Sequence, residues 1–590
     1  MVQSCAASRI SATRIHLLPR SGKMTRLAPR RLHQVMSTTK NNPTIPASPT
    51  RAAARAHFSG GNNKTMTSTS KERKPINLLR GWPAYDLLPA DAIREASQTA
   101  LSDPRIYMPG LEYGPDPGYQ PLREELAGWL QRFYGLRDDD DDDDDESSAD
   151  NITITGGASQ SAACLLQSFT DPARTLAVWM VAPCYFLACQ IFDDAGFAGR
   201  LRAVPEHEDG EGVDLDALER GMRELEEGQK GKVKGKGREG DGDEEGAAPY
   251  KDVGPHRKVY RHVIYCVPTF ANPSGRTMTA ARRKGLVALA RKYDALVICD
   301  DVYDMLQWRT QEGYSASSSG SVSTLAASSH LDLDRALLPR LVDLDIALGP
   351  SEYDPPGKHF GHVVSNGSFS KLVGPGMRTG WTYSTPDFAF GTAQTGSTKS
   401  GGAASQIAAT MICELLKKRV AGNTTRQEEE CVLDRHIRYV LRPAYAQRHR
   451  HLASTIHDVL SPLGITVVDN SLRGQDGVFG GYFIWMNLPT STTWTGSEPK
   501  LWPTAAAIAK RCKTDEDLLI GNGELFAVHG DETAAPFDRA IRLCFAWEEE
   551  DKIVDGVRRL GRIIRKMLDE GPEIWESGDK KVKGDVDESK

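Results

Sequence analysis

Residues 362–381 read His-Val-Val-Ser-Asn-Gly-Ser-Phe-Ser-Lys-Leu-Val-Gly-Pro-Gly-Met-Arg-Thr-Gly-Trp. The run at 362–368 predicts a buried strand, and Lys371 follows it almost at once. A lysine at the end of a buried strand is costly unless it has a partner or a task. A Schiff base with an aldehyde cofactor is the chemistry that suits lysine best. Ser368 and Arg378 can hold a phosphate. The alternative is a surface loop that carries a lysine and an arginine.

Two further polar clusters follow predicted strands, at the edge where α/β sheets bind ligands. Asp300 ends the strand predicted at 295–300, and Tyr303 follows three residues later. A buried carboxylate needs a cationic partner, and a protonated pyridine nitrogen is one. A strand-end aspartate that caps a helix is the alternative for Asp300. Asn272 lies in Pro-Thr-Phe-Ala-Asn-Pro-Ser-Gly (268–275), which by itself indicates only a turn.

A glycine-rich turn links the strand predicted at 151–155 to a helix at 157–169. It reads Gly-Gly-Ala-Ser-Gln (156–160). Backbone N–H groups and the helix dipole at such a turn bind phosphate. The signal is weak by itself, because it lacks the three spaced glycines of a dinucleotide site.

The order of apolar runs predicts an α/β fold. The expected strands are continuous apolar runs, which is typical of buried, mostly parallel strands. They lie at 151–155, 175–182, 259–267, 295–300 and 362–368, with helical patterns at 157–169, 184–195 and 279–294. After residue 400 the pattern changes to helices at 403–419, 430–460 and 551–569 and strand-like runs at 480–489 and 540–547. This indicates a smaller α+β domain.

Charge is distributed unevenly over the 590 residues. The net charge is −6, but residues 1–70 hold 11 basic and no acidic side chains, so the rest carries −17. A basic leader rich in Ser, Thr and Ala is typical of a mitochondrial transit peptide, whereas a later start such as Met66 predicts a cytoplasmic protein. No run of eighteen apolar residues occurs, which argues against a membrane span. A mildly acidic chain argues against nucleic-acid binding.

Three stretches are expected to be surface loops that bury no apolar surface: 138–149 with its aspartate run, 206–257 and 309–330. Ten cysteines without Cys-x-x-Cys spacing predict buried free thiols and no metal site. The predicted organisation is a leader (1–75), an N-terminal segment joining the small domain (76–104), a large domain (105–400), a small domain (401–570) and a charged tail (571–590).

Taken together, these clusters resemble the class I/II aminotransferases, which are pyridoxal-phosphate enzymes of fold type I. The similar segments are SFSKLVGPGMRTGW (368–381), ICDDVY (298–303), PTFANPSG (268–275), TGGASQ (155–160), LEYGPDPGYQPLREELAGWL (111–130), INLLRGWPAYDLLP (76–89) and IRLCFAW (541–547). The resemblance covers about 76–567 and is strongest to the branch of 2-aminoadipate, kynurenine and aromatic transaminases.

The resemblance implies a role for each matching residue. Lys371 would form the Schiff base with pyridoxal 5′-phosphate and move the α-proton. Asp300 would pair with the pyridine nitrogen, and Arg542 would bind the substrate α-carboxylate. The remaining roles are the 3-oxygen contact (Tyr303, Asn272), ring stacking (Tyr185), the phosphate site (Ala158, Ser159, Gln160, Ser368, Arg378), close approach of the substrate (Gly81) and, from a partner subunit of a homodimer, a phosphate contact (Tyr113).

The expected reaction is amino transfer from an aromatic, 2-aminoadipate-like or broader set of amino acids to a 2-oxo acid, by a ping-pong cycle. Two alternatives remain from the sequence. The same lysine chemistry permits C–S elimination or cyclopropane formation. A non-catalytic regulator would need a DNA-binding helical module upstream, and residues 1–75 show no adequate helical period. His529 is expected to be structural.

Overall fold

The computed structural model describes residues 74–135, 147–234, 249–309, 333–402, 404–419, 430–472, 477–492 and 500–571. The predicted leader and tail therefore lie outside the described residues, except for 74–75 and 571. The aspartate run and residues 310–330 of the third expected loop also lie outside them. No helix in the described ranges is long and apolar enough to cross a membrane.

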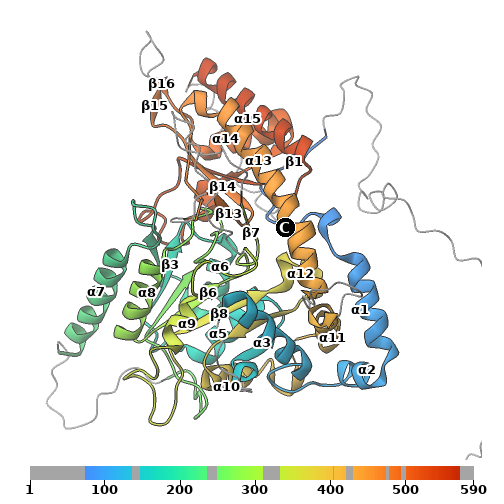
Figure 1. The fold of residues 1–590 in the computed structure, drawn as a ribbon. Helices are drawn as coiled ribbons and strands as arrows, with labels where there is room; N and C mark the ends of the chain where they lie inside the picture. The colour runs from blue at the N-terminus through green and yellow to red at the C-terminus, as the bar shows by residue number, and fades with distance from the viewer. Residues whose placement is uncertain are drawn as a thin grey trace, which may run out of the picture. The chain divides into compact units, whose positions relative to one another are not determined.

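A seven-stranded sheet forms the centre of the large domain (Figure 1). Its strands are, in spatial order, β2 (Ile152–Thr155), β9 (Gly380–Tyr383), β8 (Val363–Ser368), β6 (Ala295–Asp300), β5 (His262–Cys266), β3 (Ala177–Ala182) and β4 (Leu201–Pro205). Strand β9 runs antiparallel to its neighbours β2 and β8, and the remaining strand pairs of the sheet are parallel. The predicted α/β class and mostly parallel sheet are confirmed. The sequence analysis did not identify β4 and β9.

Both faces of this sheet are buried. Along β5, Val263 and Tyr265 belong to one hydrophobic cluster, and Ile264 and Cys266 belong to the other. Because successive side chains of a strand point to opposite faces, helices must cover both sides. The helices of the large domain are α3 (Gln120–Tyr134), α5 (Ala158–Phe169), α6 (Phe186–Phe192), α7 (Leu215–Lys234), α8 (Ala280–Lys292), α9 (Leu341–Ile346) and α10 (Pro386–Ala393).

The C-terminal part combines helices with a four-stranded antiparallel sheet. The strand order is β12 (Thr466–Val467), β14 (Phe483–Asn487), β19 (Ala540–Cys544) and β18 (Gly521–Asn522). The helices are α11 (Gln406–Leu416), α12 (Val432–His436), α13 (Arg442–Val459), α14 (Ala505–Glu516) and α15 (Glu550–Glu570). Helix α13 packs along α15 (Figure 1).

The N-terminal segment is bound to this C-terminal part. Strand β1 (Ile76–Asn77) pairs in parallel with β17 (Leu518–Leu519). The Cys544 N–H at the end of β19 donates to the Leu78 carbonyl at 2.8 Å. Helices α1 (Ala90–Ser102) and α2 (Pro104–Leu111) follow, and both pack against α11. Residues 77–83 are thereby fixed beside β19.

The expectation that 206–257 is wholly a surface loop is wrong. Residues 215–234 form helix α7, and Val213, Leu218 and Met222 are fully buried. The apolar residues in this stretch are few but spaced three or four apart, which places them on one helix face. The many charged residues between them hide that period. Residues 147–150 of the first expected loop likewise form a short helix, α4 (Ser147–Asp150).

Nine cysteines lie in the described ranges, and all nine are buried and free. The prediction of buried thiols is confirmed for them, whereas Cys5 lies outside the described residues.

Replacing Leu218 with alanine tests whether α7 belongs to the core. Leu218→Ala should lower the free energy of unfolding by about 2–4 kcal/mol, because it removes a fully buried side chain. Glu224→Ala, an exposed change on the same helix, should cost less than about 0.5 kcal/mol. Urea unfolding of the three proteins measures both values. Equal effects of the two substitutions would contradict the assignment.

Candidate active site

A cavity of about 240 Å³ opens at the C-terminal edge of the parallel strands. Asp300 ends β6 and Ser368 ends β8, so both reach the cavity from the sheet. Residues 79–83 of the N-terminal segment and Arg542 of β19 form other parts of its wall. The cavity thus lies where α/β sheets hold ligands.

Eleven of the thirteen predicted site residues line this one cavity. They are Gly81, Ala158, Ser159, Tyr185, Asn272, Asp300, Tyr303, Ser368, Lys371, Arg378 and Arg542. They come from seven separate stretches of sequence between residues 81 and 542. The other two, Gln160 and Tyr113, do not line it.

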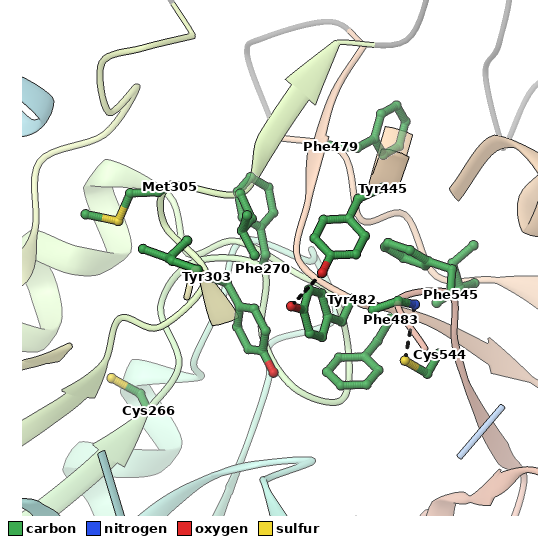
Figure 2. Close-up of a cluster of buried hydrophobic side chains, with 14 of the residues drawn as sticks. Cys266, Phe270, Tyr303, Met305, Tyr445, Phe479, Tyr482, Phe483, Cys544 and Phe545 are labelled. Atoms are coloured by element: carbon green, nitrogen blue, oxygen red, sulfur yellow. Dashed lines mark hydrogen bonds between the residues drawn. The ribbon is translucent and has the colours of Figure 1, made fainter. Parts of the chain in front are cut away.

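Lys371 extends into the cavity from the short helix Phe369–Lys371. Its Nζ donates to the Gly81 carbonyl at 2.9 Å and lies 5.9 and 5.4 Å from the ring centres of Tyr303 and Tyr482. The Tyr482 hydroxyl donates to the Lys371 carbonyl at 3.3 Å. It also forms a hydrogen bond with the Tyr445 hydroxyl (Figure 2). Burial lowers the pKa of Lys371 to about 8, because the charged form loses water. A neutral amine is therefore accessible near neutral pH.

Asp300 has one satisfied and one unsatisfied oxygen. The Tyr265 hydroxyl donates to Oδ2 at 2.8 Å, whereas the buried Oδ1 has no hydrogen-bond partner among the described residues. Burial raises the pKa of Asp300 to about 6. Asn366 faces Asp300 in the β6–β8 register and lines the cavity. A buried carboxylate oxygen without a partner indicates that a ligand donor completes the site.

The start of α5 offers a phosphate cradle. Ser161 is the first residue to donate within this helix, to the Gly157 carbonyl, so the N–H groups of residues 158–160 precede the hydrogen-bonded turns. Arg378 donates to the Gly156 carbonyl at 2.5 Å and to the Pro375 carbonyl at 3.2 Å. A Cβ on Gly157 would lie 2.7 Å from the Arg378 guanidinium, at a φ of +99°. Only glycine leaves the space in front of the helix open.

Arg542 is 2% exposed and points into the cavity from β19. It donates to Asn272 Oδ1 at 2.8 Å and to the Leu79 carbonyl, and it lies between the rings of Phe483 and Phe526 at 4.2 and 4.5 Å. Its buried Nε has no partner within the described ranges. Burial lowers the pKa of Arg542 to about 10, so it stays charged at neutral pH. This fork can pair with a carboxylate.

Tyr185 and Tyr303 are the two predicted tyrosines at the cavity wall. Tyr185 precedes α6, and burial raises its pKa to about 12, so its ring stays uncharged. Tyr303 is 3% exposed, and its ring lies 5.4 Å from that of Tyr482 (Figure 2). Its hydroxyl points away from the Tyr445–Tyr482 pair.

Gln160 and Tyr113 are placed differently. The Gln160 side chain accepts from the Gly156 N–H at 3.0 Å and approaches Cys164, so only its backbone can serve the cradle. Tyr113 is 87% exposed, away from the cavity of its own chain. His529 pairs with Asp193 at 2.6 Å on the surface and does not line the cavity.

Sequence reasoning missed several polar or aromatic residues of the cavity wall, among them Arg80, Trp82, Tyr265 and Asn366. Tyr265 and Asn366 lie within buried strands, where only a polar residue in an apolar run could have given a signal. Arg80 and Trp82 flank Gly81 in a segment that the sequence analysis quoted but used only for its glycine.

The residues present fit pyridoxal phosphate. One cavity is lined by a lysine amine, which can react with an aldehyde, and by a buried carboxylate with one unpaired oxygen. The same cavity is lined by a helix N-terminus with an arginine beside it. Each matches one part of that cofactor: the aldehyde, the ring nitrogen and the phosphate.

The model of the family "Aminotransferase class I and II" matches residues 73–553. The chain belongs to this family. The predicted family, fold type and cofactor are confirmed: this protein is an aminotransferase that depends on pyridoxal 5′-phosphate.

Individual relatives cover most of the chain. A Saccharomyces cerevisiae protein described as uncharacterized is 29% identical over 83% of this chain and 97% of its own length. Aromatic-amino-acid aminotransferase 1 of Thermococcus litoralis is 26% identical over 84% and 88%. The crystal structure of Pyrococcus horikoshii kynurenine aminotransferase shares the fold, with a TM-score of 0.56 and 24% identity over 84% of this chain and 92% of that chain.

The raised pKa of Asp300 predicts that this carboxyl lowers the stability of the cofactor-free protein, by an amount that depends on pH. Between pH 3.8 and about 6 the folded state holds a proton that the unfolded chain has lost, so stability falls as pH rises through this window. Asp300→Asn should therefore stabilise the apoenzyme at pH 7.5 by up to about 3 kcal/mol, and less where water enters the cavity. The gain should vanish toward pH 4. Denaturant unfolding at both pH values measures it, and a gain independent of pH would contradict the assignment.

Proposed function

We propose that this aminotransferase takes its amino group from an aromatic amino acid and passes it to a 2-oxo acid, with Lys371 as the reacting lysine. The observation that carries the proposal is that Lys371, Asp300 and Arg542 line one cavity. The name of the Thermococcus litoralis relative supports an aromatic donor. So do apolar and aromatic residues of the wall, which include Trp82, Pro83, Phe186, Leu187 and Ile191. A 2-aminoadipate-like donor is the second class to be tried.

Each proposed role follows from a contact of the side chain. Pyridoxal 5′-phosphate, when bound, supplies an electron-accepting ring that stabilises the negative charge left by loss of the α-proton. Asp300 Oδ1, which has no donor among the described residues, would pair with the ring nitrogen and favour its protonated form. Lys371 Nζ, with a pKa lowered to about 8, takes the α-proton and returns it.

Substrate and cofactor are oriented by the remaining residues. Arg542, held by Asn272 and the Leu79 carbonyl, binds the α-carboxylate. Tyr185 would pack on the cofactor ring, and Tyr303 and Asn272 would donate to its 3-oxygen. The start of α5, Ser368 and Arg378 would bind the phosphate. The absence of a Cβ at Gly81 matters because that atom would lie 2.8 Å from Phe483, which stacks on Arg542.

The reaction itself is tested by a single half-cycle. Adding phenylalanine, tyrosine or 2-aminoadipate to the holoenzyme should convert the visible cofactor spectrum to the pyridoxamine form and release one equivalent of 2-oxo acid. Lys371→Ala should slow this conversion by about 10²- to 10⁴-fold, because it removes the base. Lys292→Ala, at a surface lysine paired with Glu219, should leave the rate unchanged. Release of pyruvate and ammonia from cysteine-type substrates, without amino transfer, would contradict the proposal and select elimination.

A homodimer is part of the proposal. Tyr113 is 87% exposed, and Met108 and Leu111 are exposed on the same stretch at 55% and 66%. Apolar side chains gathered at one exposed site favour an interface. Tyr113 then donates to the cofactor phosphate of the partner subunit.

Sedimentation velocity of the holoenzyme should give twice the mass of one chain. Tyr113→Phe removes only the hydroxyl and should weaken cofactor binding by about 5- to 20-fold, consistent with one lost hydrogen bond to a charged group. Tyr250→Phe, at another exposed tyrosine, is the matched control. A monomeric holoenzyme, or unchanged cofactor affinity in Tyr113→Phe, would overturn this part.

A further inference from the structure

Tyr265 is a buried polar residue of the cavity wall to which the proposed chemistry gives no role. It lies on β5, the strand next to the one that Asp300 ends, and it is 3% exposed. Its hydroxyl donates to Asp300 Oδ2 at 2.8 Å. Among the described residues this is the one hydrogen bond that the carboxylate receives, because Oδ1 has no partner there. Tyr265 thus determines which oxygen of Asp300 is left for a ligand.

The Tyr265 ring is fixed by the sheet and by α6. In the sheet, Tyr265 lies beside Met180 of β3 and Ile298 of β6. Its ring packs edge-on against that of Phe192, with ring centres 5.7 Å apart. A ring held in this way cannot follow a carboxylate that rotates. The hydrogen bond therefore holds the Asp300 side chain in one orientation.

Two other polar groups near Asp300 do not share this task. Asn366 of β8 faces Asp300 in the strand register, but its Nδ2 donates to the Ala158 carbonyl at 3.0 Å. Lys371 Nζ donates to a backbone carbonyl of the N-terminal segment at 2.9 Å. Neither group forms a hydrogen bond with the Asp300 carboxylate in the part of the chain that the structure describes. The orientation of this carboxylate thus depends on Tyr265.

The same hydrogen bond acts on the charge of Asp300. Burial raises the pKa of this carboxyl to about 6, and the Tyr265 hydroxyl opposes burial more strongly than the nearby Lys371 cation does. Asp304 acts in the same direction as burial. Burial also raises the pKa of Tyr265 well above its ordinary value, so the hydroxyl keeps its proton and serves as the donor. A donor to an ionised carboxylate favours the ionised form.

We propose that Tyr265 is a positioning residue that keeps Asp300 ionised and leaves its Oδ1 for the ring nitrogen of the cofactor. Tyr265 acts through Asp300, which becomes a weaker base when its other oxygen accepts a hydrogen bond. The shared proton then stays on the nitrogen. A carboxyl that took this proton would lose its charge, and the ring would accept electrons less readily. The inference rests on the role of Asp300 in the proposed function.

The protonation state of the ring nitrogen tests this inference directly. The enzyme is loaded with pyridoxal 5′-phosphate that carries ¹⁵N in the ring, whose NMR shift distinguishes the protonated from the neutral nitrogen. At about pH 7.5 the wild type should show the protonated form and Tyr265→Phe a shift toward the neutral form. Asp300→Asn supplies the neutral reference. Tyr260→Phe, which removes a buried hydroxyl that donates to the Gly361 carbonyl at 2.6 Å, is the matched control and should keep the wild-type shift.

Cofactor binding to the cofactor-free protein supplies a second readout. Tyr265→Phe should weaken the affinity for pyridoxal 5′-phosphate by roughly 5- to 50-fold, the effect expected for a hydrogen bond to a charged group. The 1-deaza analogue has a carbon in place of the ring nitrogen and cannot pair with Asp300. Its affinity should therefore change by less than about 3-fold, which also shows that the cavity of the variant is intact.

The outcomes separate this inference from the proposed function. A wild-type nitrogen shift in Tyr265→Phe, or equal losses of affinity for the cofactor and its 1-deaza analogue, would overturn the inference and leave the proposed function standing. A nitrogen that stays protonated in Asp300→Asn would overturn the proposed role of Asp300, and the inference with it.

Discussion

Two backbone carbonyls of the N-terminal segment, those of Leu79 and Gly81, hold the two cations on which the site depends. The carbonyl of Leu79 accepts from Arg542, and the carbonyl of Gly81 accepts from Lys371. The segment is itself fixed by the β1–β17 pairing and by the Cys544 N–H on the Leu78 carbonyl. The end of β8, strand β19 and the segment 76–81 are thereby connected. The spacing between the reacting amine and the carboxylate-binding arginine follows from this arrangement.

Buried polar atoms of the site lack a hydrogen-bond partner among the described residues. Asp300 Oδ1 and Arg542 Nε are among these atoms. Burial raises the pKa of Asp300 and lowers those of Lys371 and Arg542, and both changes favour the neutral forms. Such groups cost stability in the empty protein. A ligand with a protonated ring nitrogen, a phosphate and carboxylates supplies the missing partners. The same desolvation lowers the pKa of Lys371 to about 8, so a fraction of the amine is neutral near physiological pH.

The sequence predicted the parts of the fold and site that local patterns specify. Continuous apolar runs located β2, β3, β5, β6 and β8, and polar residues at the ends of these runs located Asp300, Ser368 and Lys371. Helix α7 was missed because dense charge obscured its apolar period. Tyr265 and Asn366 were missed because they lie inside strands, and only the three-dimensional structure reveals which residues they contact. Arg80 contacts Trp547, which is far away in sequence, so no local pattern reveals this contact.

The central claim is that Lys371 is the residue that binds the cofactor covalently. Reducing the holoenzyme with borohydride fixes the cofactor on its lysine, and peptide mass spectrometry then identifies that lysine. We expect to find the phosphopyridoxyl group on the peptide that contains Lys371, in an amount close to one per chain. Finding the group on another lysine, or on none although cofactor is bound, would contradict it.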